Sequence, residues 1–395
     1  MADQIENYPF PAGPRGCPAH QYAARRENDP LGTVRLPSGD LSGLAVRHAD
    51  ALMVFGDSRF TRELTYQGAP RIYPGFDVST DPDSMINMDP PRHSRLRRLM
   101  SGAFTPRRIE AWRPRVRTLA HELVDGLPEE FDFVTAFAFP LPVQVICEVM
   151  GVDGIDTERV RDWTDAFVTS SGRTVDERIH AALEFAGYIA ELIAAHRDDP
   201  GDGVLAALIT AHDEGDRLSD EELVRNTLGL FLAGHETTGT VLTRSMLRLL
   251  APRDGWERLA AEPAVIPNAV EELLRSEAPG EGSMIRVATE DVALPSGVIR
   301  KGEPVIASFI GANHDPEVFP DPFTLTLDRE NAAGHLSFGR GAHFCLGASL
   351  ARMELQEALG VLTERLPGLR LAEEADKVVW SGELVYRPGS LLLRR

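Results

Sequence analysis

The most chemically informative cysteine of this sequence stands in a loop rich in glycine. Residues 337–347 read SFGRGAHFCLG, and the cysteine of this run is Cys345. Three glycines let the backbone turn tightly and approach a flat macrocycle without obstruction by side chains. Residues 348–366 follow with helical periodicity, and the positive end of a helix dipole stabilises a nearby thiolate. The pattern predicts that Cys345 is the axial ligand of a haem iron.

A second unusual segment lies in the middle of a long helical pattern. The pattern spans about residues 220–250 and opens with a capping box formed by Ser219 and Glu222. In its middle, residues 233–240 read AGHETTGT, with two glycines and three threonines where a stiff turn belongs. Glycine costs about 1 kcal/mol there relative to alanine, and threonine hydroxyls compete for the carbonyls of the preceding turn. We expect this turn to kink or widen the helix and to be functional, because such local conflicts are typical of functional sites.

Both segments resemble motifs of the cytochromes P450. The cysteine loop is similar to the haem-binding loop of that family, and the run AGHETT is similar to its oxygen-activation motif. The resemblance implies that Ala233 and Gly234 allow close approach to the haem face. It also implies that Thr237, beside bound dioxygen, orients the hydroperoxide and an ordered water, while Glu236 passes protons in from solvent. His235 occupies the variable position and is expected to pack or to form a salt bridge. The loop residues that the resemblance places against haem are Phe338, Gly339, His343, Cys345 and Gly347.

A glutamate–arginine pair is expected to brace the cysteine loop. Glu272 and Arg275 are three residues apart in a helical segment that begins with Pro267, a spacing that by itself gives a weak surface ion pair. Here it resembles the Glu-x-x-Arg motif of the P450 family, completed by Arg329. The resemblance implies a structural role, in which the planar guanidinium groups lock the loop that leads to Cys345.

The same resemblance supplies partners for the two haem propionates. His93 and Arg97 are four residues apart, hence on one helix face, in the run DPPRHSRLR. Arg286 matches the arginine that opens a β-strand after the Glu-x-x-Arg helix, and His343 matches the histidine of the cysteine loop. Four cationic or donor groups suit two carboxylates, because charge-assisted hydrogen bonds are strong.

The resemblance also locates a substrate pocket. Its expected lining comes from parts of the segments 68–88 and 166–171, from the long helix and from two later segments. These contributions are mostly small or aliphatic, which favours a bulky apolar substrate. Compact P450s of this kind often tailor polyketide or peptide natural products, as in antibiotic biosynthesis. The pocket residues expected on this basis are Leu230, Ala233, Ser283, Met284, Ile285 and Val385.

The cysteine count and the net charge limit other classes of function. Cys17, Cys147 and Cys345 are odd in number and widely spaced, which excludes a disulfide framework and a zinc ribbon. Cys147 stands in an apolar stretch and is expected to be a small buried hydrophobe. The formal net charge of −19 argues against nucleic acid as a partner.

One basic segment stands out against this acidic background. Residues 92–117 contain nine arginines and a single acid, Glu110. Such a patch can dock an acidic partner by electrostatic steering, although charge runs are also typical of a solvated helix face. No flavin or ferredoxin domain is fused to the chain, so the resemblance implies that ferredoxin and ferredoxin reductase deliver electrons from NAD(P)H.

These features predict a mainly α fold with a smaller β portion, the cytochrome P450 fold. The sequence shows no linker, repeat or low-complexity tract, so residues 1–395 are expected to form a single domain. The first residues lack a basic and an apolar signal region, and no apolar run reaches membrane-spanning length. We therefore expect a cytoplasmic bacterial protein without a membrane anchor.

The predicted activity is that of a haem-thiolate monooxygenase with haem b. It inserts one atom of O2 into a C–H or C=C bond of an apolar substrate. A first alternative is a haem-thiolate enzyme outside the monooxygenase cycle, such as a peroxygenase, dehydratase or rearrangement catalyst; the intact pair Glu236 and Thr237 counts against it. A second is a non-enzymatic haem protein, such as a sensor, which no additional output domain supports.

Overall fold

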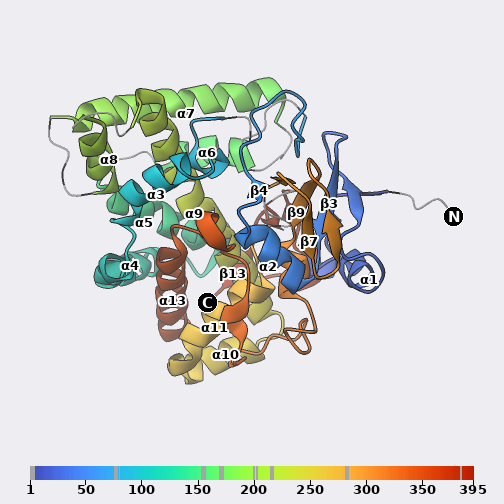
Figure 1. Cartoon of the computed structure of the whole chain (residues 1–395). Coiled ribbons are helices and arrows are strands. Elements are labelled where there is room, and N and C mark those ends of the chain that lie inside the picture. Colours follow the sequence, from blue (N-terminus) through green and yellow to red (C-terminus); the bar gives the residue numbers. More distant parts are fainter. Residues whose placement is uncertain are drawn as a thin grey trace.

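The structure is a computed structural model that describes residues 5–74, 79, 81–152, 157–168, 173–198, 201, 203–213, 218–280, 284–382 and 385–395. Most helices gather on one side of the molecule, and the strands near the N-terminus lie on the other side together with α1 and α2 (Figure 1). The helices are α1 His20–Asn28, α2 His48–Gly56, α3 Arg92–Ser101, α4 Pro106–Asp125, α5 Pro140–Met150, α6 Thr157–Val168, α7 Val175–His196, α8 Val204–Asp213, α9 Asp220–Leu250, α10 Asp254–Ala261, α11 Ile266–Ser276, α12 Phe309–Asn313 and α13 Ala348–Arg365.

The strands are short and form small sheets. The largest sheet has the order β1-β2-β3-β9-β6-β4, in which β3 and β9 are parallel neighbours although they are far apart in the sequence. The strands β11 and β12 form an antiparallel hairpin near the C-terminus. The strands are β1 Glu6–Asn7, β2 Thr33–Arg35, β3 Leu41–Ala45, β4 Phe60–Thr61, β5 Glu130–Asp132, β6 Arg286–Ala288, β7 Val292–Leu294, β8 Gly297–Ile299, β9 Pro304–Ala307, β10 Arg370–Leu371, β11 Trp380–Ser381, β12 Arg387–Pro388 and β13 Leu392–Arg394.

Helix α9 runs through the centre of the helical part (Figure 1). The predicted capping box is present, because the Ser219 hydroxyl accepts from the amide of Glu222 while the Glu222 carboxylate accepts from the amide of Ser219. At 1.5 Å per residue, its length is about 45 Å. The expected kink does not interrupt the helix, which is continuous from Asp220 to Leu250. Threonine hydroxyls bond carbonyls one turn back, as at Thr243 and Gly239 (2.8 Å), without breaking the helix.

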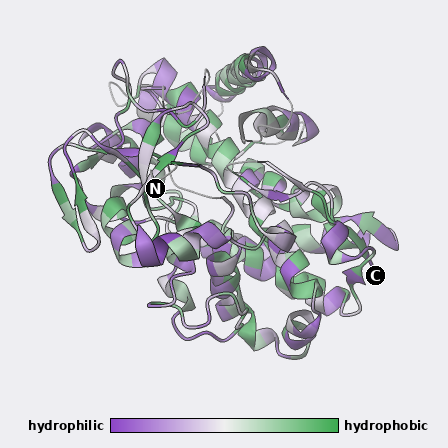
Figure 2. Cartoon of the chain, turned by 90° about the vertical axis from the view of Figure 1, so that its right-hand side faces the viewer, coloured by the Kyte–Doolittle hydropathy of each residue, from purple (hydrophilic) through white to green (hydrophobic). Residues whose placement is uncertain are grey.

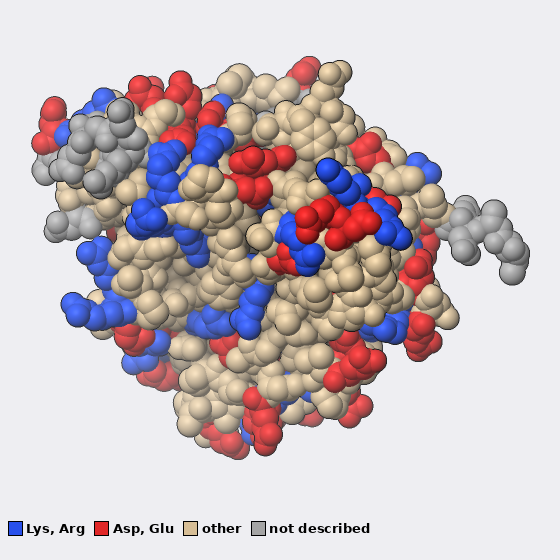
Figure 3. Space-filling model, viewed as in Figure 1, with Lys and Arg blue, Asp and Glu red and all other residues tan. Residues whose placement is uncertain are grey.

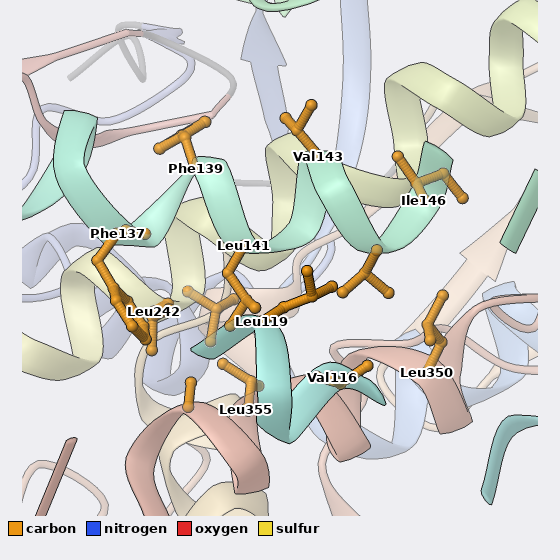
Figure 4. Packing of buried hydrophobic residues seen from close by; sticks show 14 of the residues in the cluster. Val116, Leu119, Phe137, Phe139, Leu141, Val143, Ile146, Leu242, Leu350 and Leu355 are labelled. Atoms are coloured by element: carbon orange, nitrogen blue, oxygen red, sulfur yellow. The ribbon is translucent and has the colours of Figure 1, made fainter. Parts of the chain in front are cut away.

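The main apolar core surrounds α9. Helices α4, α5, α9 and α13 and the segment directly before α5 interdigitate there through branched and aromatic side chains, ten of which are labelled in Figure 4. Many helices carry hydrophilic and hydrophobic residues side by side (Figure 2), as expected for helices that bury one face. Cys147 belongs to this core, and burial raises the pKa of its thiol to about 12. The interpretation of Cys147 as a buried hydrophobe is therefore confirmed.

Candidate active site

The cysteine loop is held in a tight backbone path between α2 and α13. The amide of Cys345 donates to the carbonyl of Phe338 at 2.9 Å, which closes the loop on itself. Gly339 and Gly341 have φ values of 67° and 70°, a conformation that favours glycine. A Cβ atom at Gly341 would lie 2.8 Å from the carbonyl oxygen of Phe55. The glycines at these two positions are therefore required by the path of the backbone.

Gly347 differs from the other two glycines. Its φ is −86°, which any residue adopts, and it caps the N-terminus of α13 directly after the cysteine loop. A Cβ atom added there would meet no atom within 4 Å in the described part of the chain. Gly347 therefore leaves space beside Cys345 that a bound group can enter.

A cavity of about 180 Å³ lies between α9 and the cysteine loop. Its lining from α9 includes Leu230, Ala233, Gly234 and Thr237, and its lining from the loop includes Phe338, Cys345 and Gly347. Within residues 231–240, Ala233 and Thr237 are the exposed positions, and they lie one turn apart on one face of the helix. The structure thus brings two sequence motifs together that are about a hundred residues apart.

The acid and the alcohol of α9 point in different directions. The Thr237 hydroxyl lines the cavity and donates to the carbonyl of Ala233 at 3.0 Å, so its lone pairs stay available as acceptors. Glu236 is buried instead, with one carboxylate oxygen 3.5 Å from Nε of Arg387 on β12. Glu236 is thus held by the C-terminal hairpin and does not line the cavity beside Thr237.

Gly234 allows a close approach between two helices. A Cβ atom there would lie 2.7 Å from the side chain of Ile146 on α5. Gly234 also lines the cavity, but the missing Cβ faces α5. Its neighbour His235 is fully buried and bonded to Phe231 and Thr164. His235 packs as expected, and its ring is held by these hydrogen bonds rather than by a salt bridge.

The Glu-x-x-Arg network is buried and fully connected. Arg275 donates to both carboxylate oxygens of Glu272 at 2.7 and 2.8 Å, and Arg329 donates to the same carboxylate at 3.0 Å. Arg275 also donates to the carbonyl of Asn313 at 2.8 Å. The Asn313 side chain in turn accepts from the amide of Leu336 at 2.8 Å and donates to Ser337 at 2.8 Å. This chain of bonds reaches the first residues of the cysteine loop.

The side chains of His93, Arg97, Arg286 and His343 interact electrostatically with one another, and that of Arg97 also interacts with Cys345. The rings of His93 and His343 have centroids 4.3 Å apart. Both ring nitrogens of His93 and Nε2 of His343 are buried without a hydrogen-bond partner among the described residues. Burial, as the largest cause, lowers the pKa of His343 to about 3 and that of Arg286 to about 10, and it also lowers the pKa of His93 and of Arg97. Within the described ranges, neither arginine has a carboxylate at ion-pair distance.

Comparison with known proteins identifies the chain. The sequence model of the cytochrome P450 family matches residues 157–366. The chain is 41% identical over 374 residues to the mycinamicin IV hydroxylase/epoxidase of Micromonospora griseorubida, with 93% of each protein covered. It is 41% identical over 397 residues to nocardicin C N-oxygenase of Nocardia uniformis subsp. tsuyamanensis, with 98% of this chain and 96% of the relative covered. The chain belongs to the cytochrome P450 family.

The solved structures agree with this assignment. The crystal structure of HinD with NMFT and NO has a TM-score of 0.93 and 37% identity, and the match covers 100% of both chains. The mainly α fold of this P450 with its smaller β portion is therefore confirmed, as is its class of activity, monooxygenation. None of the helices in the described ranges is long and apolar enough to cross a membrane.

The residues of this P450 fit the haem that its family implies. Both ring nitrogens of His93 and Nε2 of His343 are buried without a partner among the described residues. Any of these nitrogens that carries a proton can donate to a haem propionate, which is an acceptor of the required charge. Burial, its largest cause, raises the pKa of the Cys345 thiol, while the Gly347 amide and the charge of Arg97 lower it. A thiolate at this position therefore needs a further positive partner, which a metal ion provides.

The expected substrate-side residues are only partly brought together. Leu230 and Ala233 line the cavity. Ile285 does not line it, because its side chain packs in a second apolar cluster beside Leu64 and Ile306. Val385 pairs with Gly280, the residue after Pro279, which does line the cavity. Met284 is half-buried. Ser283 and parts of the segments 68–88 and 166–171 lie outside the described residues.

Sequence reasoning missed three residues that the structure brings to the site. Arg387 reaches Glu236, Thr164 reaches His235, and Glu354 lines the cavity from α13. The sequence analysis assigned no role to any of these three residues. Only Glu354 gave a usable signal, because an acid in an apolar-periodic helix close to the cysteine predicted to hold haem is unusual.

Proposed function

We propose that this P450 oxidises an apolar small molecule, with haem b held by Cys345 and electrons supplied by a ferredoxin. The observation that carries the proposal is the shared cavity, which Thr237 lines from α9 and Cys345 lines from the loop. Haem bound there would be held by the Cys345 thiolate, and the Thr237 hydroxyl would lie on the part of the lining that α9 contributes. The reaction is the transfer of one oxygen atom of O2 to a C–H or C=C bond, with the other atom leaving as water.

The residues have separate roles in this proposal. Haem, when bound, supplies the redox chemistry. In P450s generally, an axial thiolate favours cleavage of the O–O bond. Thr237 orients a proton donor on the cavity side, because its lone pairs can accept from water. The Glu236 carboxylate can exchange protons, and it lies on the side of α9 away from the cavity, against Arg387. The propionates are held by His93, Arg97, Arg286 and His343.

The substrate proposed is a bulky apolar natural product of polyketide or peptide origin. The lining residues Leu230, Ala233 and Ile146 are apolar, which favours an apolar ligand. Two relatives with 41% identity act on mycinamicin IV and nocardicin C according to their names. Hydroxylation, epoxidation and N-oxygenation are all represented among these names. Product analysis is therefore needed to assign which bond of the substrate this P450 oxidises.

The redox partner is proposed to dock on the arginine-rich surface of α3 and α4. Arg98, Arg107 and Arg108 are exposed, and within the described ranges they form no ion pair. Basic side chains gather on the side of the molecule where α3 and α4 lie (Figure 3). In contrast, Arg95 pairs with Glu222 at 2.5 Å, and Arg117 pairs with Glu357 at 2.6 Å. A ferredoxin therefore has three free arginines to engage.

The ligand assignment is tested by spectroscopy. Reduced protein with carbon monoxide is expected to show the red-shifted Soret band of thiolate-ligated haem. Cys345→Ser is expected to lose this band, because a hydroxyl is a poor iron ligand, while Cys147→Ala in the core is expected to keep it. Haem-loaded wild type without the band contradicts the proposal. Spectral titration with a panel of macrolactones and cyclic peptides then identifies the substrate class.

A further inference from the structure

Both ring nitrogens of His235 are engaged in hydrogen bonds. Nδ1 lies 2.7 Å from the carbonyl oxygen of Phe231, and Nε2 lies 2.8 Å from the hydroxyl of Thr164. A carbonyl only accepts, so Nδ1 carries the ring proton and Nε2 accepts from the Thr164 hydroxyl. The ring is fully buried, and burial lowers the pKa of His235 to about 4. His235 is therefore a neutral ring with one defined tautomer.

Thr164 belongs to a unit formed by α6 and α7. The ring of Trp163, its neighbour on α6, stacks on Phe185 of α7 with centroids 5.2 Å apart. Arg178 of α7 donates to the carbonyl of Ala166 at 3.3 Å. These contacts tie the two helices to each other, so a displacement of α7 displaces Thr164 with it. The end of α6 is also where the sequence places part of the substrate pocket.

His235 directly precedes the acid and the alcohol on α9. The three consecutive side chains diverge: His235 reaches α6, Glu236 reaches Arg387, and Thr237 lines the cavity. Gly234, on the other side of His235, has no side chain to stiffen the backbone. The contact of His235 with α6 therefore acts on a turn that is locally adaptable.

We propose that His235 is a positioning residue that transmits the position of α6 to the turn of Glu236 and Thr237. With the Thr164 bond formed, the His235 ring is fixed between two helices, and the following two residues are held in one orientation. When α6 moves away, the bond breaks and the turn gains freedom. The inference rests on the role proposed above for Glu236 and Thr237 and extends it to a coupling between the position of α6 and proton delivery.

The first test needs neither substrate nor turnover. Thr164→Val removes the hydroxyl at nearly constant volume, and Thr164→Ser keeps a donor. The control is Thr227→Val, because Thr227 is buried on the same helix α9 and its hydroxyl has no partner in the described part of the chain. Hydrogen–deuterium exchange of the amides in residues 231–240 is measured in the haem-loaded proteins. We expect about fivefold faster exchange in Thr164→Val, the effect of one lost hydrogen bond, and none in the other two.

The outcomes of this test are unambiguous. Unchanged exchange at residues 231–240 in Thr164→Val, with faster exchange in α6 alone, overturns the proposal. The bond between Thr164 and His235 then only stabilises the position of α6. Faster exchange in Thr227→Val to the same degree also overturns it, because the effect is then that of any core threonine. If Thr164→Val does not fold, Thr164→Ala removes the same donor with a smaller side chain.

The second test measures the chemical consequence. With the first substrate identified by titration, we expect product per NAD(P)H consumed to fall about fivefold in Thr164→Val and to be restored in Thr164→Ser. A fully retained ratio in Thr164→Val overturns the positioning role even if exchange increases. Failure of the proposed function has a different signature, since wild type then lacks the thiolate Soret band or forms no product.

Discussion

The carboxylate of Glu236 lies 3.5 Å from Nε of Arg387, across the contact between α9 and the hairpin of β11 and β12. The Arg387 guanidinium also lies 4.3 Å above the ring of Phe139. The hairpin is anchored a second time, because Arg244 of α9 donates to the carbonyl of Tyr386 at 2.9 Å. The C-terminal hairpin therefore fixes the position of Glu236.

Replacement of Arg387 by leucine is expected to destabilise the fold. Both partners are buried, and the loss of one partner leaves a buried charge, at a cost of about 3 kcal/mol in the free energy of unfolding. Glu236→Gln combined with Arg387→Leu is expected to recover part of this loss. Denaturant unfolding measures both variants. Arg394→Leu is the control, because its pair with Glu130 is exposed; an equal loss there contradicts the prediction.

Thr237→Ala is expected to separate electron consumption from product formation. The substrate pocket is nearly unchanged by the loss of a hydroxyl and a methyl group, so substrate affinity is retained. Product per NAD(P)H is expected to fall about tenfold or more, because the group that orients the proton donor is lost, and hydrogen peroxide accounts for the missing electrons. Thr240→Ala, a buried position on the same helix, serves as control. An unchanged ratio in Thr237→Ala shows that the hydroxyl has no role in proton delivery.

Charge reversal of Arg98, Arg107 and Arg108 is expected to slow reduction by ferredoxin. Steering by such a patch changes association rates by tenfold or more at low salt, and the difference is expected to fade above about 0.1 M salt. Stopped-flow reduction across ionic strengths measures this effect. Arg35→Glu, at an exposed position of strand β2, is the control. Equal rates for all variants at low salt assign docking to another surface.

Replacement of Glu354 or of Glu357 by glutamine is expected to change the free energy of unfolding in opposite directions. Both are buried on α13, but the oxygens of Glu354 have no hydrogen-bond partner among the described residues, whereas Glu357 pairs with Arg113 at 2.7 Å and with Arg117 at 2.6 Å. Burial raises the pKa of Glu354 well above 4.5. The folded state therefore binds a proton that the unfolded state releases, and stability is lost as pH rises above about 4.5.

Glu354→Gln removes this pH dependence. Relative to wild type, we expect it to stabilise the fold at pH 7 by up to about 3 kcal/mol and to have little effect near pH 4.5. Glu357→Gln is expected to destabilise the fold at pH 7, because Arg117 loses its carboxylate partner and Arg113 keeps only its pair with Glu110. Denaturant unfolding at several pH values measures both. A Glu354→Gln variant that is less stable than wild type at pH 7 shows that the carboxylate is ionised and paired.

Much of the site follows from local sequence. The cysteine loop, the capping box of Ser219 and Glu222, and the pair Glu272 and Arg275 are recognisable because their members are at most a few residues apart. Spacing of this kind fixes geometry through the helix repeat and through the backbone freedom of glycine. The match of these runs to family motifs also predicted that Arg329 joins the network of Glu272 and Arg275, and the structure shows this contact.

The remaining relationships were decided by tertiary structure alone. The pairing of Glu236 with Arg387, the bond between His235 and Thr164, and the core position of Ile285 depend on how distant segments pack. No spacing rule links such positions, because the direction of each side chain is set by the contacts of its own helix or strand with others. The sequence by itself predicted Cys345 as the ligand and determined the class of chemistry, whereas the packing of α6, α9 and the C-terminal hairpin decided what holds Glu236 and Thr237 in place.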